Sequence, residues 1–250
     1  NALEITGKKL NEFKLVFSGA GAAALASANH LVKIGVPREN IWMCDIHGLV
    51  YKGRQEEMFP EKDLFAQGET PATLAQTLEG ADMFIGLSAA NIVTGEMLQR
   101  MRQSPVIFAM SNPDPEIKFD LAKQARPDAI IGTGRSDYPN QINNLLGFPY
   151  IFRGALDVRA RAINDEMKIA ASDALSRLAK EPVPAEVLKA YNLDHLEYGK
   201  EYVVPKPLDK RVCLWEAPAV ARAAMESGVA RVKVDLDAYV KNLEKRLMHR

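Results

Sequence analysis

The sequence has little of several features that mark whole classes of protein. Its two cysteines, Cys44 and Cys213, form no C-x-x-C pair, so neither a disulfide framework nor a zinc knuckle is indicated. The 32 basic and 32 acidic residues sum to zero, which gives no general attraction to nucleic acid or to an anionic membrane. No apolar run reaches the roughly 18 residues of a membrane helix, and no signal pattern opens the chain. We therefore expect a soluble, cytoplasmic protein that binds neither nucleic acid nor membrane.

The composition is that of a globular protein. Hydrophobic residues make up 47% of the 250 residues and charged residues 26%, which is enough to build a sizeable core. At roughly 150 residues per domain the length fits one large domain or one domain with an appendage. The chain begins with Asn1 instead of Met, so we expect it to be a piece of a longer polypeptide.

Strand-like and helix-like segments alternate through the first 150 residues. Apolar runs predict strands at 14–18, 40–45, 83–87, 106–110 and 129–131. Helices are predicted between them, from residue 22 and at 71–78, 95–102 and 119–125. Because the strands are mostly non-alternating and are joined by helices, they predict a parallel sheet covered on both faces, in a doubly wound α/β fold.

The pattern becomes helical after residue 150. Helices are predicted at 162–180, 184–191, 218–227 and 236–248, around a proline-rich stretch at 202–207. We expect residues 1–150 to form the sheet and residues 151–250 to complete the same domain with helices. Tyr239, Leu243 and Leu247 form an apolar stripe on the last helix, which we expect to pair with another subunit or domain.

The turn between the first strand and the first helix is Gly19-Ala20-Gly21-Ala22-Ala23-Ala24, of the form G-x-G-x-x-A. In a Rossmann-like fold the first glycine permits a sharp turn and the second lets backbone approach a pyrophosphate. The third small residue lets the helix pack on the strand, and the helix N-terminus attracts anions. The alternative is a glycine turn that only allows tight packing. The surrounding strand and helix favour a dinucleotide site.

Asp45 ends the second predicted strand, about 20 residues beyond the turn, where the adenosine ribose of a dinucleotide would lie. Its carboxylate would accept hydrogen bonds from a free 2′-hydroxyl and repel a 2′-phosphate, which favours NAD. The nearby His47, Lys52 and Arg54 could neutralise such a phosphate. They could equally be an ordinary solvated loop, which their charge pattern favours. The choice between NAD and NADP stays open.

Asparagines follow the last two predicted strands. Asn112 comes after the fourth strand, and Asn143 and Asn144 stand in a polar loop after the fifth. Open α/β sheets bind ligands at the carboxyl ends of their strands, so these neutral amides could hold a carboxylate or a carbonyl group. Asparagines in such loops also cap helices and tolerate turns, and the residue types alone favour that interpretation.

Several segments together resemble the cofactor-binding domain of malic enzyme in its bacterial form. The resemblance runs from about residue 1 to about residue 228 and rests on residues 19–24, 43–45, 85–88, 111–116, 134–144 and 148–157. The two asparagine segments are specific to that family. The resemblance implies oxidative decarboxylation of malate to pyruvate and carbon dioxide, with NAD or NADP as hydride acceptor and Mg or Mn bound in the full-length enzyme.

The resemblance also implies site residues. Malate would be bound by Asn112, Asn143 and Asn144. The dinucleotide would be bound by Gly19, Ala20, Gly21, Ala22, Ala23, Asp45, Ser88, Ala89 and Asn112. The family is oligomeric, so a homo-oligomer of two or more subunits is expected.

The resembling family places its tyrosine acid, its lysine base and its metal-binding carboxylates before this domain. No such motif stands in this chain, so we expect no catalytic residue and no metal ligand here, and an inactive isolated chain. The tyrosine and the lysine would lie upstream of Asn1. The alternative function is a non-catalytic module for dinucleotide sensing or assembly, since this fold hosts many functions. The asparagine segments favour the enzyme, because a sensor has no reason to carry them.

Overall fold

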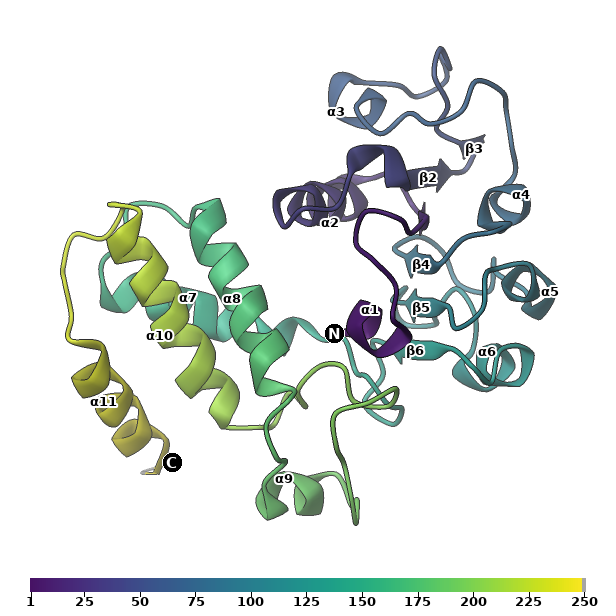
Figure 1. The fold of residues 1–250 in the computed structure, drawn as a ribbon. Helices are drawn as coiled ribbons and strands as arrows, with labels where there is room; N and C mark the ends of the chain where they lie inside the picture. The colour runs from purple at the N-terminus through teal and green to yellow at the C-terminus, as the bar shows by residue number, and fades with distance from the viewer. Residues whose placement is uncertain (249–250) are drawn as a thin grey trace. The chain divides into compact units, whose positions relative to one another are not determined.

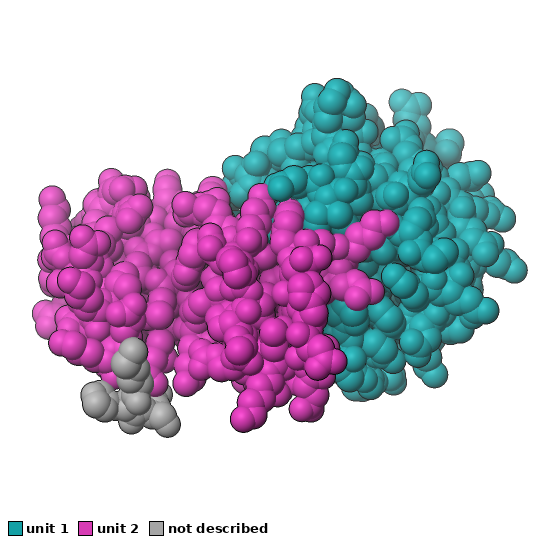
Figure 2. Space-filling model, turned by 60° about the horizontal axis from the view of Figure 1, so that its bottom comes forward, with its two compact units in different colours: residues 1–139 teal, residues 140–250 magenta. Residues whose placement is uncertain are grey.

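A computed structural model describes residues 1–248 of the chain (Figure 1). The chain divides into two compact units, Asn1–Pro139 and Asn140–Arg250, which Figure 2 colours separately. The sequence predicted the change from sheet to helices near residue 150, whereas the loop that follows Pro139 already belongs to the second unit. None of the helices within the described residues has the length and apolar character needed to cross a membrane.

Unit 1 contains a six-stranded sheet with the order β3-β2-β1-β4-β5-β6. Its strands are β1 (Leu15–Ser18), β2 (Ile41–Asp45), β3 (Gly48–Leu49), β4 (Met83–Gly86), β5 (Val106–Ala109) and β6 (Ile130–Thr133). Neighbouring strands are parallel except β2 and β3, which are antiparallel. The predicted Rossmann-like α/β fold and its five parallel strands are confirmed. The two residues of β3 are too few to leave a pattern in the sequence.

The central strand β1 is buried on both faces. Leu15 and Phe17 belong to one hydrophobic cluster, and Val16 between them belongs to another. Side chains of a strand point alternately to the two faces of a sheet, so a strand covered on both sides has a continuous apolar run. The strand order reverses at β1, which lies between β2 and β4. The carboxyl ends of β1 and β4 therefore form the place where this kind of sheet binds ligands.

The helices of unit 1 cover both faces of the sheet. They are α1 (Ala2–Thr6), α2 (Ala22–Lys33), α3 (Pro60–Asp63), α4 (Leu74–Leu78), α5 (Gly95–Gln99) and α6 (Phe119–Ala125), with the 3-10 turn η1 (Arg38–Asn40). Figure 1 shows α2 on one side of the sheet and α4, α5 and α6 on the other. The helix predicted from residue 71 begins at Leu74, because Thr73 and Gln76 form a capping box that ends the extended chain before it.

Unit 2 is helical. Its elements are η2 (Asn144–Leu146), α7 (Phe148–Asp157), α8 (Asp165–Leu178), α9 (Ala185–Ala190), α10 (Arg211–Glu226) and α11 (Leu236–Met248). Side chains of α7, α8, α10 and α11 share one hydrophobic cluster. The helices predicted at 162–180, 184–191 and 236–248 are confirmed with small changes at their ends.

The predicted start of the third helix is wrong. We expected it to begin at Pro218, but α10 begins at Arg211 and carries the proline in its interior. An interior proline removes one backbone hydrogen bond and costs about 3 kcal/mol. The buried side chains of Val212, Cys213 and Val220 lie on both sides of it and offset this loss by packing in the core of unit 2.

The apolar stripe of the last helix packs inside unit 2. Tyr239 and Leu243 are buried in the same hydrophobic cluster as α10, with Leu247 packed against it. The hydroxyl of Tyr239 also donates to a carboxylate oxygen of Asp157 at 2.8 Å. The expectation that this stripe pairs with another subunit or domain is therefore wrong, because α7 and α10 already cover it.

Candidate dinucleotide-binding site

The turn after β1 contains two glycines with different structural requirements. Gly19 has φ +109°, and a Cβ added there would lie 2.4 Å from the carbonyl oxygen of Leu87, so only glycine fits. Its N–H donates to the carbonyl oxygen of Cys44 at 2.7 Å. Gly21 has φ −87° and is the N-cap residue of α2, and a Cβ added there would meet nothing within 4 Å. The space beside Gly21 is open, as a bound pyrophosphate requires.

The first turn of α2 favours an anion. The helix has 12 residues, no acidic side chain in its first turn and no side-chain cap at its N-terminus. Ala22 and Ala23 are exposed, whereas Ala20 and Ala24 are buried. Backbone N–H groups in the first turn of a helix lack intrahelical acceptors and can donate to phosphate oxygens. The turn and helix therefore fit the phosphates of a dinucleotide.

Asp45, the last residue of β2, is held by two cations. Its carboxylate forms ion pairs with Arg54 and with Lys62, whose Nζ lies 2.5 Å from Oδ2. The N–H of His47 donates to Oδ1 at 2.9 Å. Burial acts to raise the pKa of Asp45, but the hydrogen bonds from Arg54 and Lys62 outweigh it and hold the pKa below its ordinary value. The carboxylate is therefore ionised at neutral pH.

The two cations beside Asp45 are buried. Arg54 is 4% exposed and Lys62 is 3% exposed. The interpretation of a solvated loop is therefore wrong for Arg54, although His47 and Lys52 are exposed. Asp45, Arg54 and Lys62 together carry a formal charge of +1, and the acidic side chains of Glu56 and Glu57 lie close to this group. The sequence did not point to Lys62, because no motif links α3 to the end of β2.

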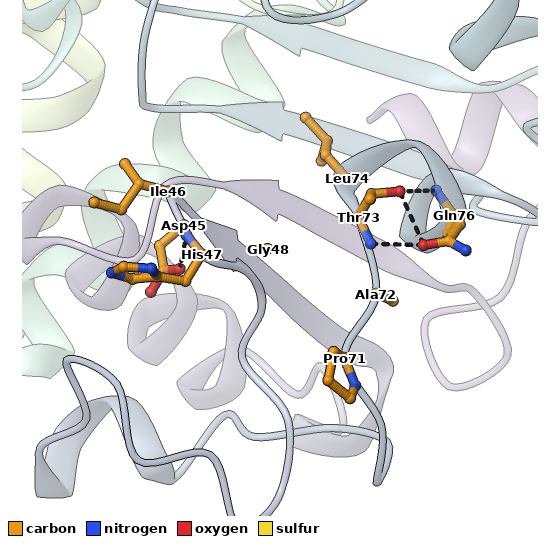
Figure 3. Close-up of a pocket in the computed structure, with 9 residues that line it drawn as sticks. All are labelled: Asp45, Ile46, His47, Gly48, Pro71, Ala72, Thr73, Leu74 and Gln76. Carbon is orange, nitrogen blue, oxygen red and sulfur yellow. Dashed lines mark hydrogen bonds between the residues drawn. The ribbon is translucent and has the colours of Figure 1, made fainter.

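A pocket lies beside Asp45 (Figure 3). One wall comes from residues 45–48 at the end of β2 and the start of β3, and the other from residues 71–74 and Gln76 at the start of α4. The walls approach closely, because a Cβ added at Gly48 would lie 2.4 Å from the carbonyl oxygen of Ala72. The pocket stands at the end of the sheet where the adenosine part of a dinucleotide is expected.

The other predicted cofactor residues follow β4 and β5. Ser88, Ala89 and Asn112 are all exposed. The Ser88 Oγ lies 2.8 Å from the Oγ of Ser18, the last residue of β1, so the loop after β4 is tied to the strand that leads into the glycine turn. The structure thus places these three residues at the same edge of the sheet as Gly21.

Glu116 joins the two loops that carry these residues, and no motif in the sequence pointed to this role. Its side chain is fully buried. Its Oε1 accepts from the N–H of Ser88 at 2.9 Å, and its Oε2 accepts from the N–H of Ser111 at 3.1 Å. Glutamate is mostly exposed in proteins, so its residue type gave no indication that Glu116 is buried. Its position in the segment 111–116 was the only feature of the sequence that could have drawn attention to it.

Asn143 and Asn144 lie in unit 2. The Oδ1 of Asn143 accepts from the N–H of Leu145 at 2.9 Å and caps η2, so the capping interpretation is confirmed for this residue. Asn144 is exposed and lines a surface pocket with Gly147 and Phe148. Asn140, earlier in the same loop, is buried and binds the backbone of Lys200 and Val203. Of these three asparagines, Asn144 has the side chain most accessible to a ligand.

Metal ligands do not gather in the described part of the chain. Among residues 1–248 no three His, Cys, Asp or Glu side chains come together in a way that could hold a metal ion. These residues therefore do not form a metal site by themselves.

A parallel sheet with this strand order, a G-x-G turn into α2 and an acidic residue at the end of β2 defines a dinucleotide-binding α/β domain of the Rossmann type. Residues 1–192 match the family model described as the malic enzyme NAD-binding domain, and the chain belongs to this family.

The relatives and the solved structures agree with this assignment. The chain is 52% identical to the NAD-dependent malic enzyme of Rhizobium meliloti over 98% of its own length and 32% of that protein. It is 52% identical to the NADP-dependent malic enzyme of Halomonas elongata over 92% of its length and 54% of that protein. The crystal structure of malic enzyme from Pyrococcus horikoshii superposes with a TM-score of 0.84 at 36% identity, covering 98% of this chain and 55% of that one. The chain therefore spans from about a third to slightly more than half of the length of these proteins.

Proposed function

We propose that this chain is the part of a malic enzyme that binds NAD or NADP, and that the full-length protein oxidises and decarboxylates malate to pyruvate and carbon dioxide. One observation carries the proposal: the position beside Gly21 is open, at the N-terminus of α2, although Gly19 in the same turn is closely packed. A turn that served packing alone would have no need of a second glycine whose Cβ position is empty.

Each part of the site has a role in this proposal. The backbone N–H groups of residues 21–23 bind the pyrophosphate, with Gly19 and Ala20 forming the turn. Asp45 and its two cations hold the adenosine ribose, and Ser88 and Ala89 lie beside the nicotinamide half. A dinucleotide held by these residues would supply the acceptor for the hydride that leaves C2 of malate. Asn112, Asn144 and Asn143 orient the substrate with neutral amides, which bind a carboxylate without neutralising it.

The acid, the base and the metal are proposed to come from the rest of the full-length protein. The described residues contain no cluster of three or more His, Cys, Asp or Glu side chains that could hold the metal. We propose Mg or Mn as the metal of the complete enzyme, a homo-oligomer as its assembly and the cytoplasm as its location. The balance of 32 basic and 32 acidic residues gives no reason to propose nucleic acid or membrane as a partner.

We infer that the adenosine end accepts both dinucleotides. The Asp45 carboxylate can accept a hydrogen bond from a 2′-hydroxyl in place of one of its present donors. Arg54 and Lys62 place two cations beside this carboxylate, and a 2′-phosphate would be attracted to both. The relatives are consistent with this, because NAD-dependent and NADP-dependent enzymes stand at the same identity to the chain.

Isothermal titration of the chain with NADH and with NADPH tests the proposal. We expect weak binding of both, in the range of tens to hundreds of micromolar, because the isolated chain lacks the rest of the enzyme. Absence of heat with either ligand, for a chain that is folded by circular dichroism, would reject the dinucleotide site.

A second experiment separates the enzyme from a dinucleotide-sensing or assembly module. The remainder of the full-length polypeptide, expressed separately with Mg or Mn, is added to this chain together with malate and NAD or NADP. Malate-dependent formation of NADH or NADPH supports the enzyme. Binding of the dinucleotide without turnover, when the two parts form a complex, supports the sensor.

A further inference from the structure

The loop after β4 and the loop after β5 are joined through one buried carboxyl group. Glu116 has no exposed surface and receives the N–H groups of Ser88 and Ser111 on its two separate oxygens, at 2.9 and 3.1 Å. The Ser88 hydroxyl also lies 3.4 Å from Oε1. A carboxylate that accepts one backbone N–H on each oxygen fixes the separation and the direction of both peptide groups.

The surrounding backbone is arranged to admit this side chain. A Cβ added at Gly86, the last residue of β4, would lie 2.3 Å from the carboxyl carbon of Glu116, so the carboxyl group occupies space that a side chain would otherwise fill. The main chain of the two loops is joined as well, because the N–H of Val93 donates to the carbonyl oxygen of Glu116 at 3.0 Å. The Ser111 hydroxyl donates to the carbonyl oxygen of Ser88 at 3.3 Å.

The residues next to these peptide groups are the ones assigned to the nicotinamide half and the substrate. Ser88 is one of Glu116's two backbone partners and is followed by Ala89, while Ser111, the other partner, is followed by Asn112. Ser88 also contacts Ser18 at the end of β1, which leads into the glycine turn. A displacement of the Glu116 carboxyl group would therefore move the nicotinamide side of the site, while the first turn of α2 and the end of β2 keep their own contacts.

We propose that Glu116 is a positioning residue that fixes the loops after β4 and β5 so that Ser88, Ala89 and Asn112 face the nicotinamide end of the dinucleotide. This inference rests on the proposed function, since it concerns the same site. Glu116 touches neither reactant and acts through the two peptide groups that it holds.

Two ligands separate this role from general stability. NADH contains the nicotinamide riboside, whereas ADP-ribose contains the adenosine and pyrophosphate parts without the nicotinamide. We expect Glu116→Gln to weaken NADH binding about tenfold and to change ADP-ribose binding by less than about twofold, because an amide cannot accept on both of its atoms. Isothermal titration of the folded variants with each ligand measures both affinities.

Gly86→Ala is an independent variant, because it keeps glutamate at position 116. Its methyl group would occupy the space of the Glu116 carboxyl group and push that group aside. It is expected to produce the same selective loss for NADH. Asp82→Asn is the matched control: Asp82 is a buried carboxylate before β4, at the opposite end of that strand, and accepts from the N–H of Lys14 at 2.9 Å. It should lower the melting temperature and leave the ratio of the two affinities unchanged.

A measurement on the unaltered chain covers the case in which these variants do not fold. The amide protons of Ser88 and Ser111 should exchange with solvent at least about a hundredfold more slowly than those of Ala89 and Asn112, because both are donated to a buried group. Fast exchange of either amide, or equal weakening of NADH and ADP-ribose in a folded Glu116→Gln, would overturn the inference. If the unaltered chain binds neither ligand, the proposed function itself fails and this inference fails with it.

Discussion

At the scale of the residue, the two glycines of the turn after β1 have separable roles. Gly19 has a positive φ and no room for a Cβ, whereas Gly21 has an ordinary φ and open space around it. We predict that Gly21→Val abolishes measurable dinucleotide binding by isothermal titration, a loss of about a hundredfold or more, because the side chain takes the place of the pyrophosphate. The free energy of unfolding should change by less than about 1 kcal/mol.

Gly19→Ala should behave in the opposite way and lower the free energy of unfolding by about 2 kcal/mol, because alanine is strained at this φ and contacts the Leu87 carbonyl group. Gly199→Ala in unit 2, where an added Cβ has its nearest neighbour at 3.9 Å, serves as the control that alters neither property. Normal NADH affinity in a folded Gly21→Val would contradict the assignment of the turn.

Glu216 is a second residue whose environment makes a clear prediction. It is fully buried in α10, and within the described residues neither carboxyl oxygen has a hydrogen-bond partner. Burial raises the pKa of Glu216 to about 9. The folded chain therefore keeps the proton at neutral pH, whereas the unfolded chain releases it near its ordinary pKa of 4.5. Unfolding therefore releases a proton between these two pKa values, and the free energy of unfolding falls as the pH rises from 4.5 toward 9. Below pH 4.5 both states keep the proton and this loss is absent.

We predict that Glu216→Met stabilises the chain at pH 8, because it removes two buried oxygens without partners. The gain over the unaltered chain should grow by up to about 1.4 kcal/mol per pH unit between pH 6 and 8. Urea unfolding at several pH values measures it, with Glu226→Gln on the exposed face of the same helix as control. A gain that is constant with pH would mean that Glu216 is already ionised in the folded chain.

At the scale of the element, the end of β2 and the short helix α3 act together. Lys62 lies in α3, but its ammonium group pairs with Asp45 and also donates to the carbonyl oxygen of Glu57 at 3.0 Å. We predict that Lys62→Ala lowers the affinity for NADPH about tenfold and changes the affinity for NADH less than about twofold, because it removes one positive charge from the place of the 2′-phosphate.

Lys52→Ala is the matched control, since Lys52 is an exposed lysine close to Asp45 in sequence. Its removal should leave both affinities unchanged at 0.15 M salt, where exposed charges are screened. Fluorescence titration with the two reduced dinucleotides measures the comparison. An equal loss for NADH and NADPH in Lys62→Ala would mean that α3 only supports the fold.

At the scale of the whole molecule, each unit has its own hydrophobic clusters and one tryptophan. Trp42 packs in unit 1 and Trp215 packs in unit 2. We predict that the units unfold with separate midpoints in urea.

In a Trp215→Phe background, the fluorescence of Trp42 reports the unfolding of unit 1, and Gly19→Ala should lower the urea midpoint of that unit. In a Trp42→Phe background, fluorescence reports unit 2, and Glu216→Met should raise that midpoint while Gly19→Ala leaves it nearly unchanged. Equal shifts of both reporters would show a single cooperative unit.

The parts of the fold that sequence reasoning predicted are those set by short stretches of chain. The five parallel strands were visible as uninterrupted apolar runs, because both faces of each are covered. The glycine turn was visible because two backbone requirements fall within three residues, Gly19 and Gly21. The predicted helix start at Pro218 was wrong. Proline is favoured at the first position of a helix, but the packing of buried side chains along α10 outweighs the cost of a proline in its interior.

The sequence by itself determined the kind of fold, the place of the glycine turn and the family, since each depends on the order of residues within a few turns of chain. Only the tertiary structure decided that Asp45 is paired with Lys62, that Glu116 holds two loops together and that Glu216 is buried without a partner. Those contacts depend on which loops meet at the edge of the sheet and which helix faces turn inward. No local periodicity encodes them, because the charge and polarity of a side chain do not specify its distant neighbours.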